Sequence, residues 1–181
     1  TPPVLVLERV GIGEERISWY DLAPEMNVKD SSGTPANVTE ELVLLGKELT
    51  EAQRDSLRAQ FGGITFDGIA PHHPVPQQLV LPYTHNHIAF DFNAVETSRP
   101  QLVSYQYMLE GYDTDWSPLV KKTSASFGNI REGTYTFRVK AQGPNGLWSE
   151  PIAYSFTLLP PWYRTWWAYG IYALLFLWGL R

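Results

Sequence analysis

Two stretches of alternating residues constrain the fold of this chain more than any other feature. Every second residue is apolar or aromatic from Val103 to Leu109, and the same alternation returns from Tyr135 to Ala141. A period of two residues is typical of antiparallel strands that bury one face and leave the other in water. Pro144-Asn145-Gly146 then offers the residues of a turn. The sequence therefore predicts a sheet organised around Leu102–Trp148.

Shorter alternating runs predict the rest of a β-sandwich. They lie at residues 2–7, 78–83, 87–95, 122–129 and 152–158. About seven short strands separated by turns favour an all-β, immunoglobulin-like or fibronectin-III-like antiparallel sandwich. We expect this domain to occupy residues 1–160. Tyr135 opens a strand, and we expect it to pack inward and to hydrogen-bond back to the preceding corner, as in the tyrosine corner of such sandwiches.

Residues from about 37 to 77 interrupt the strand pattern and are predicted to form an insertion. Thr50-Glu-Ala-Gln53 is a capping-box signature, which predicts a short helix over about 51–61 that Gly62-Gly63 ends. A brief strand is predicted earlier, at Glu15–Trp19. The insertion is either a decoration packed on the sandwich edge or a contact surface for a neighbouring domain or subunit.

The C-terminal part of the chain is an apolar run. Trp166–Leu180 contains no formally charged residue, and four aromatic residues gather between positions 162 and 167, as in the aromatic belt at a membrane face. As a helix this run would span roughly 22 Å, short of the ~30 Å hydrocarbon core. We therefore interpret residues 161–181 as the start of a transmembrane helix that is truncated at Arg181. The alternative is a buried helix of a soluble protein, which normally has a polar face.

Composition excludes several classes of function. The net charge of −5 gives no electrostatic basis for binding nucleic acid, and the absence of cysteine rules out disulfides and thiolate chemistry. The sequence has no glycine-rich phosphate loop and no Gly-x-Ser-x-Gly nucleophile motif. We therefore predict neither an enzyme nor a cofactor site.

Two groups of residues are of types that can bind metal ions. Asp113 and Asp115 lack the further oxygen ligands that calcium requires, and a turn explains them better. The histidines do not stand at an established zinc spacing, and we interpret them as exposed turn and strand-edge residues. No metal site is predicted. The histidines are His72, His73, His85 and His87.

The central strands and their turns resemble the three-tyrosine (Y_Y_Y) domain of bacterial two-component regulators and hybrid sensor histidine kinases. The resemblance is good over about Leu79–Trp167 and weak over Pro2–Glu8. The residues that carry this family signature are Tyr105, Tyr107, Gly111, Trp116, Gly133, Tyr135, Phe137, Ala141, Gly146, Trp148, Pro160 and Pro161.

The resemblance implies an extracytoplasmic module that transmits a signal. In this family a propeller-type sensor domain usually precedes the module, and a membrane helix and a histidine kinase or another output domain follow. We expect residues 1–160 to lie in the periplasm of a bacterium, next to the inner membrane, and to pair as a homodimer. Ligand binding upstream would change how the two sandwiches meet, and Pro160-Pro161, which restrict the backbone, would pass that change to the helix.

Two other functions stay open from the sequence. The chain could be a membrane-anchored sandwich that binds a glycan or a protein partner directly, for which Trp116 and Trp148 are the weak candidates. It could also be a spacer in a surface enzyme whose catalytic domain lies elsewhere. The alternation places Tyr105, Tyr107 and Tyr135 on the apolar face, which favours a core role over a sugar-stacking platform.

Overall fold

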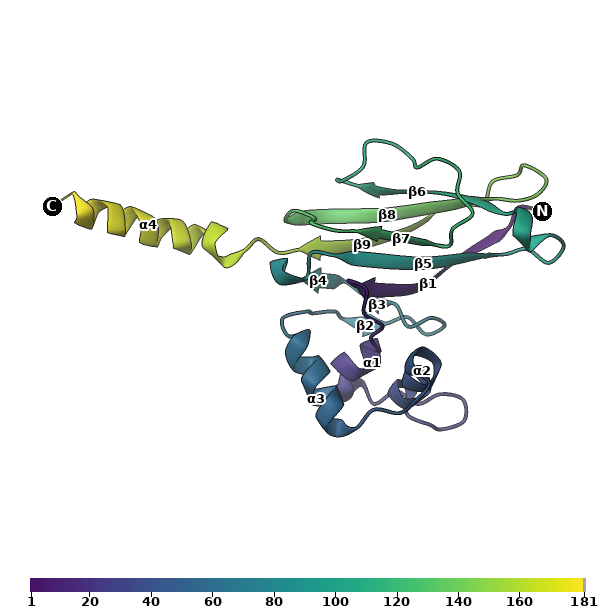
Figure 1. Cartoon of the computed structure of the whole chain (residues 1–181), viewed down its shortest axis with the longest axis horizontal. Helices are drawn as coiled ribbons and strands as arrows, with labels where there is room; N and C mark the ends of the chain where they lie inside the picture. The colour runs from purple at the N-terminus through teal and green to yellow at the C-terminus, as the bar shows by residue number, and fades with distance from the viewer. Residues whose placement is uncertain (181) are drawn as a thin grey trace.

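The alternating segments form two facing β-sheets in the computed structural model, which describes residues 1–180 (Figure 1). One sheet has the strand order β1-β5-β7 and the other has the order β4-β9-β8-β6. Neighbouring strands are antiparallel except β4, which runs parallel to β9. The bounds are β1 (Val4–Ile12), β4 (Leu79–Leu81), β5 (Ile88–Val95), β6 (Ser104–Glu110), β7 (Ser124–Phe127), β8 (Gly133–Gln142) and β9 (Ile152–Leu158).

An aromatic core lies between the two sheets. Phe90 of β5 stacks on Phe137 of β8 with ring centroids 4.1 Å apart, and Phe92 lies 6.1 Å from the same ring. All three side chains are buried. Burying one phenylalanine contributes roughly 1.5–3 kcal/mol, so this cluster is a main source of stability. The predicted β-sandwich is confirmed, and the two strands expected at its centre pair directly, with Tyr105 opposite Ala141 and Leu109 opposite Phe137.

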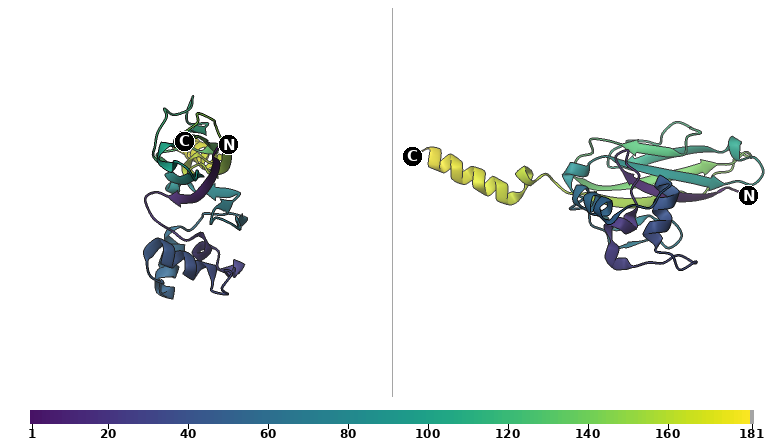
Figure 2. Two further views of the ribbon diagram at one scale, coloured as in Figure 1. Left: turned by 90° about the vertical axis from the view of Figure 1, so that its right-hand side faces the viewer. Right: turned by 60° about the horizontal axis from the view of Figure 1, so that its bottom comes forward.

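Residues 13–78, between β1 and β4, form a second layer that we call the helical subdomain. Figure 1 shows it below the sandwich, and the left view of Figure 2 separates the two layers. It begins at residue 13 rather than at about 37, where the sequence predicted an insertion to start. Its elements are α1 (Trp19–Leu22), a 3-10 turn η1 (Pro24–Met26), α2 (Ala36–Leu45), α3 (Glu51–Gln60), β2 (Gly68–Ile69) and β3 (Pro76–Gln77).

The helix predicted from the capping box is confirmed as α3. The Thr50 hydroxyl accepts a hydrogen bond from the Gln53 amide at 3.3 Å, and the Gln53 side chain accepts one from the Thr50 amide at 3.0 Å. The helix ends one residue earlier than expected because Phe61 is the C-cap. This reciprocal pair satisfies amide groups that otherwise lack partners at a helix N-terminus.

The strand predicted at Glu15–Trp19 is wrong, because Trp19 begins α1. Its indole N–H donates to the carbonyl of Val10 at 2.7 Å, and its ring is fully buried. This contact turns the chain away from the sheet directly after β1. Helix α2 was not predicted at all, because its buried face mixes apolar and charged residues: Glu40 and Glu41 are buried beside Leu44, whereas Val43 is 74% exposed.

The chain leaves the sandwich at the end of β9. A short 3-10 turn, η4 (Trp162–Arg164), leads into α4 (Trp166–Gly179), which extends away from the sandwich at the end opposite the N-terminus (Figure 1). No helix within residues 1–180 combines the length and the apolar composition needed to cross a membrane. The remaining 3-10 turns are η2 (Tyr83–His85) and η3 (Pro100–Leu102).

Candidate functional site

Tyr135 holds the corner between β7 and β8. Its side chain is buried, and its ring stacks on Phe156 at 5.7 Å. The hydroxyl donates to the carbonyl of Arg131 at 2.8 Å. Burial, with a smaller contribution from Glu132, raises the pKa of Tyr135, so the hydroxyl keeps the proton that it donates. This is the tyrosine corner that the sequence predicted.

Two signature glycines allow the chain to pass close to this tyrosine. Gly111 has a φ of +94°, and a Cβ at this position would lie 3.1 Å from Cδ1 of Tyr135. Gly133 has a φ of +147°. A side chain would be strained at both positions. Gly146, with a φ of +79°, belongs to the turn after β8 and has no such contact.

The other two signature tyrosines are core residues. The Tyr105 hydroxyl accepts a hydrogen bond from the Ala94 amide at 3.2 Å and donates one to Oδ1 of Asn93 at 3.3 Å. Tyr107 is half-buried, and its ring centroid lies 6.2 Å from those of Phe92 and Phe137. Their apolar bodies fill the core while the Tyr105 hydroxyl finds partners. Phe137 and Ala141, on the neighbouring strand β8, are also buried.

Trp116 and Trp148 meet on the outer side of β8. The Lys140 ammonium group lies 4.4 Å from the ring centroid of Trp116 and 4.6 Å from that of Trp148. A cation over an exposed aromatic ring contributes about 0.5–1 kcal/mol. Both rings thus cover a lysine that would otherwise stand in water. One ring face of each candidate ligand-binding residue is occupied by this lysine.

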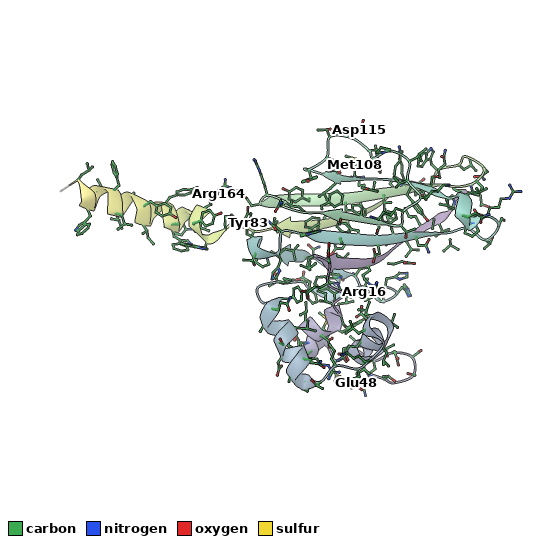
Figure 3. All side chains as sticks on the ribbon, in the orientation of Figure 1. Arg16, Glu48, Tyr83, Met108, Asp115 and Arg164 are labelled. Atoms are coloured by element: carbon green, nitrogen blue, oxygen red, sulfur yellow. The ribbon has the colours of Figure 1, made fainter. Side chains whose placement is uncertain are left out.

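Residues 159–165, which we call the exit segment, connect β9 to α4. The Leu159 amide donates to the Leu81 carbonyl at 2.9 Å. Pro160 is exposed, whereas Pro161 is buried. Arg164 Nη1 lies 2.8 Å from Glu132 Oε1, and Figure 3 labels Arg164 at the junction between the sandwich and α4. An ion pair between Arg164 and Glu132 of the corner therefore follows shortly after the signature prolines.

Helix α4 exposes apolar side chains on all sides. None of its residues is charged, and only Ala168 of its residues is buried within the part of the chain described. Trp166 is 86% exposed and Trp178 is 81% exposed. A helix that is apolar all round is normally buried in a protein or in a membrane. Its other strongly exposed apolar residues are Tyr169, Leu174, Leu175, Phe176 and Leu177.

The helical subdomain has a charged core that sequence reasoning missed. Arg54 of α3 donates to both carboxylate oxygens of Glu41 at 2.8 and 3.0 Å, and its Nε lies 3.6 Å from Oδ1 of Asp21. All three side chains are buried. Burial raises the pKa of Asp21 to about 6. Burial also opposes ionisation of Glu41, but hydrogen bonds from Arg54 and the Leu49 amide lower its pKa overall.

The sequence also gave no indication of a groove between this subdomain and β1. Its volume is about 570 Å³, and its wall includes Arg9, Tyr20, Glu40 and the loop that carries His72 and His73. Glu40 accepts a hydrogen bond from the Ser18 hydroxyl at 2.7 Å. Burial raises the pKa of Glu40 to about 7. The buried carboxylates of α2 gave no signal in the sequence because charged residues on a helix are usually solvated.

The candidate metal ligands do not come together in the structure. His72 and His73 lie on the loop before β3. His85 is in η2, and its ring centroid lies 5.4 Å from that of Phe61. Within residues 1–180 no group of three or more potential ligand residues could hold a metal ion. Asp113 accepts a hydrogen bond from the Leu109 amide at 2.9 Å, so it is a turn residue, as predicted.

Comparison with known proteins places part of this geometry in a family. Residues 96–159 match the Y_Y_Y domain, a range narrower than the resemblance predicted from sequence. Histidine kinase P4 of Formosa agariphila is 34% identical over 71 residues, which are 39% of this chain and 5% of that protein. The signature tyrosines and glycines lie within the matched range, as does the tyrosine corner. The Y_Y_Y domain that these residues match is a non-catalytic domain.

One solved structure shares the fold over most of this chain. The extracellular domain of BT3049 from B. thetaiotaomicron, which is assigned as a hybrid two-component system, aligns with 88% of this chain and 16% of its own length, at 22% identity and a TM-score of 0.50. The extracellular domain of BT4673 from the same organism aligns with 49% of this chain and 13% of its own, at 24% identity and a TM-score of 0.42. This chain thus spans less than a fifth of these relatives.

Proposed function

We propose, from the premise that residues 96–159 are a Y_Y_Y domain, that this chain is the signal-transmitting extracytoplasmic module of a membrane-bound two-component regulator. In this proposal residues 1–160 lie in the periplasm and two copies pair. A propeller-type sensor domain precedes them, and an output domain such as a histidine kinase follows. The similarity of one segment to a histidine kinase supports this assignment.

The observation that carries the proposal is the direct connection between the sandwich and an apolar helix. The matched domain ends at residue 159, and α4 begins at Trp166. The exposed apolar surface of α4 is unfavourable in water, because each buried CH₂ group gains about 0.8 kcal/mol. Lipid is the environment that would cover all sides of such a helix at once. We propose that α4 is the part of a membrane helix nearest the sandwich, with Trp162, Tyr163, Trp166 and Trp167 at the interface.

The relay would be mechanical. Ligand binding upstream must favour one arrangement of the two sandwiches over another, because a ligand that binds both arrangements equally shifts nothing. The buried Pro161 and the hydrogen bond from Leu159 to Leu81 hold the exit segment against the sandwich. A change in the sandwich pair would therefore move the start of α4.

Replacing Pro160-Pro161 with Gly-Gly in the full-length regulator tests this function. We expect the response of the output domain to the inducing condition to fall at least several-fold, while the amount of protein in the membrane and the thermal unfolding of the sandwich stay unchanged. Pro118→Gly is the matched control, since Pro118 is exposed and lies outside the exit segment. A full response from the Gly-Gly variant would count against a stiff relay.

The alternative of a directly ligand-binding sandwich receives less support. It requires aromatic faces that are free to stack on a ligand, and Trp116 and Trp148 both face Lys140. Their contact with Lys140 gives both rings a partner within the chain. We therefore place the signal-transmitting function first.

A further inference from the structure

An ion pair joins the tyrosine corner to the exit segment. Arg164 Nη1 and Glu132 Oε1 are 2.8 Å apart, and the side chains are 52% and 26% exposed, respectively. Within residues 1–180 it is the one salt bridge between the exit segment and the sandwich. The second carboxylate oxygen of Glu132 is buried without a hydrogen-bond partner. The guanidinium of Arg164 is therefore the group that balances this carboxylate.

The corner that carries Glu132 is the point where the chain crosses from one sheet to the other. It connects β7 of the three-stranded sheet to β8 of the four-stranded sheet. The buried Ile130 donates its amide to the Asn86 carbonyl at 3.2 Å, and Tyr135 holds the Arg131 carbonyl. Glu132 follows these two fixed residues directly. A shift of one sheet relative to the other must therefore displace its carboxylate.

The exit segment is ordered up to the first turn of α4. The Arg164 amide donates to the Pro161 carbonyl at 2.9 Å, and the Thr165 hydroxyl donates to the Trp162 carbonyl at 2.5 Å. The Thr165 carbonyl then accepts from the Tyr169 amide at 3.2 Å, within α4. A displacement of Arg164 is therefore transmitted to α4, because the hydrogen-bonded exit segment is not a flexible linker.

The prolines alone do not fix the direction of α4. A proline ring fixes φ but leaves its own ψ free to rotate, so the helix could point in several directions from the end of β9. A contact at a distance from the prolines removes this freedom. Arg164 and Glu132 supply such a contact, with one partner on the exit segment and the other on the crossing between the sheets.

We propose that Glu132 and Arg164 form a latch that sets the direction of α4 relative to the two sheets. Both are positioning residues of the relay; the importance of the latch for signalling rests on the proposed function, but its effect on α4 is a property of this chain. An ion pair at this exposure biases two orientations by at most about fivefold. The latch is therefore weak enough to be released by a rearrangement of the sheets.

Distances between two spin labels measure the direction of α4. The chain has no cysteine, so Ala153→Cys on β9 and Leu177→Cys on α4 give two unique labels at exposed positions. The full chain, in detergent micelles, is measured by double electron–electron resonance. We expect a narrow distance distribution with one main distance in the parent. In Arg164→Ala and in Glu132→Gln the distribution should widen, because the second orientation gains up to about fivefold relative to the main one. High salt should widen the parent distribution in the same way, because it screens exposed charges.

Two further variants separate the latch from a general loss of charge. The exchange Glu132→Arg with Arg164→Glu should restore the narrow distribution. Arg138→Ala removes another exposed ion pair, to Glu110 at 2.6 Å, and should leave the distribution unchanged. An Arg164→Ala distribution as narrow as that of the parent would overturn the latch. A wider distribution combined with an unchanged signalling response would instead leave the latch standing and count against the proposed relay.

Discussion

The sandwich buries a largely apolar core, whereas the helical subdomain buries charged side chains beside apolar ones such as Trp19 and Phe61. The sandwich closes over the stacked rings of Phe90 and Phe137. The helical subdomain closes over Arg54 and its buried carboxylates, Glu41 and Asp21. An apolar core tolerates changes of pH, whereas buried carboxylates with shifted pKa values tie stability to pH. The two layers of one short chain should therefore respond differently to the same perturbation.

The largest expected difference follows from removing the buried guanidinium. Arg54→Ala leaves Asp21 and Glu41 buried without their cation, which typically costs about 3–5 kcal/mol. We expect amides of the helical subdomain to lose protection against hydrogen exchange while those of β5 and β8 keep it. Lys47→Ala removes an exposed cation of the same subdomain and should have a much smaller effect. Equal loss of protection in both layers would mean that they unfold as one unit.

The pH dependence of stability should distinguish the helical subdomain from the sandwich, with an effect of intermediate size. Burial raises the pKa of Glu40 to about 7 from an ordinary value of 4.5, so the folded state holds a proton that the unfolded state releases between these values. Stability of the helical subdomain should therefore fall as the pH rises from about 4.5 to 7, by on the order of 1–3 kcal/mol. Urea unfolding followed at several pH values measures this slope.

Glu40→Gln is the matching variant for this titration. It should flatten the slope and stabilise the subdomain above pH 7, because the amide keeps an oxygen for the Ser18 hydroxyl without a titratable group. Glu25→Gln, at an exposed position, should leave the slope as it is. A slope that Glu40→Gln does not change would assign the pH dependence to other groups, Asp21 first among them.

The smallest expected effect concerns the corner. Tyr135→Phe removes the hydrogen bond from the hydroxyl to the Arg131 carbonyl and keeps the buried ring, so we expect a loss of about 1 kcal/mol. The loss should not depend on pH below the ordinary pKa of tyrosine, unlike the effect of Glu40→Gln. Chemical denaturation monitored by near-ultraviolet circular dichroism measures it. No loss at all would show that the hydroxyl is equally well satisfied by water.

The sequence was a good guide wherever local pattern decides structure. Alternation located the strands of both sheets, although β1 runs on to Ile12 rather than ending at residue 7. The capping box located α3, and Gly133-Thr-Tyr135 located the tyrosine corner. Helix α2 was missed because it buries Glu40 and Glu41 and exposes Val43, which breaks the apolar stripe of an amphipathic helix. Glu132 and Arg164 were not linked because only the folded corner brings them together. Charged groups that pair across long separations leave no periodic signal.

The proposed relay requires that the sandwich stands in water while α4 lies in lipid. Spin labels at Leu174→Cys on α4 and Ala153→Cys on β9, each on the full chain reconstituted in phospholipid vesicles, test it by power saturation. We predict that oxygen, which concentrates in lipid, relaxes the Leu174 label strongly, whereas a water-soluble nickel complex relaxes the Ala153 label. Equal relaxation of both labels by the nickel complex would contradict the account.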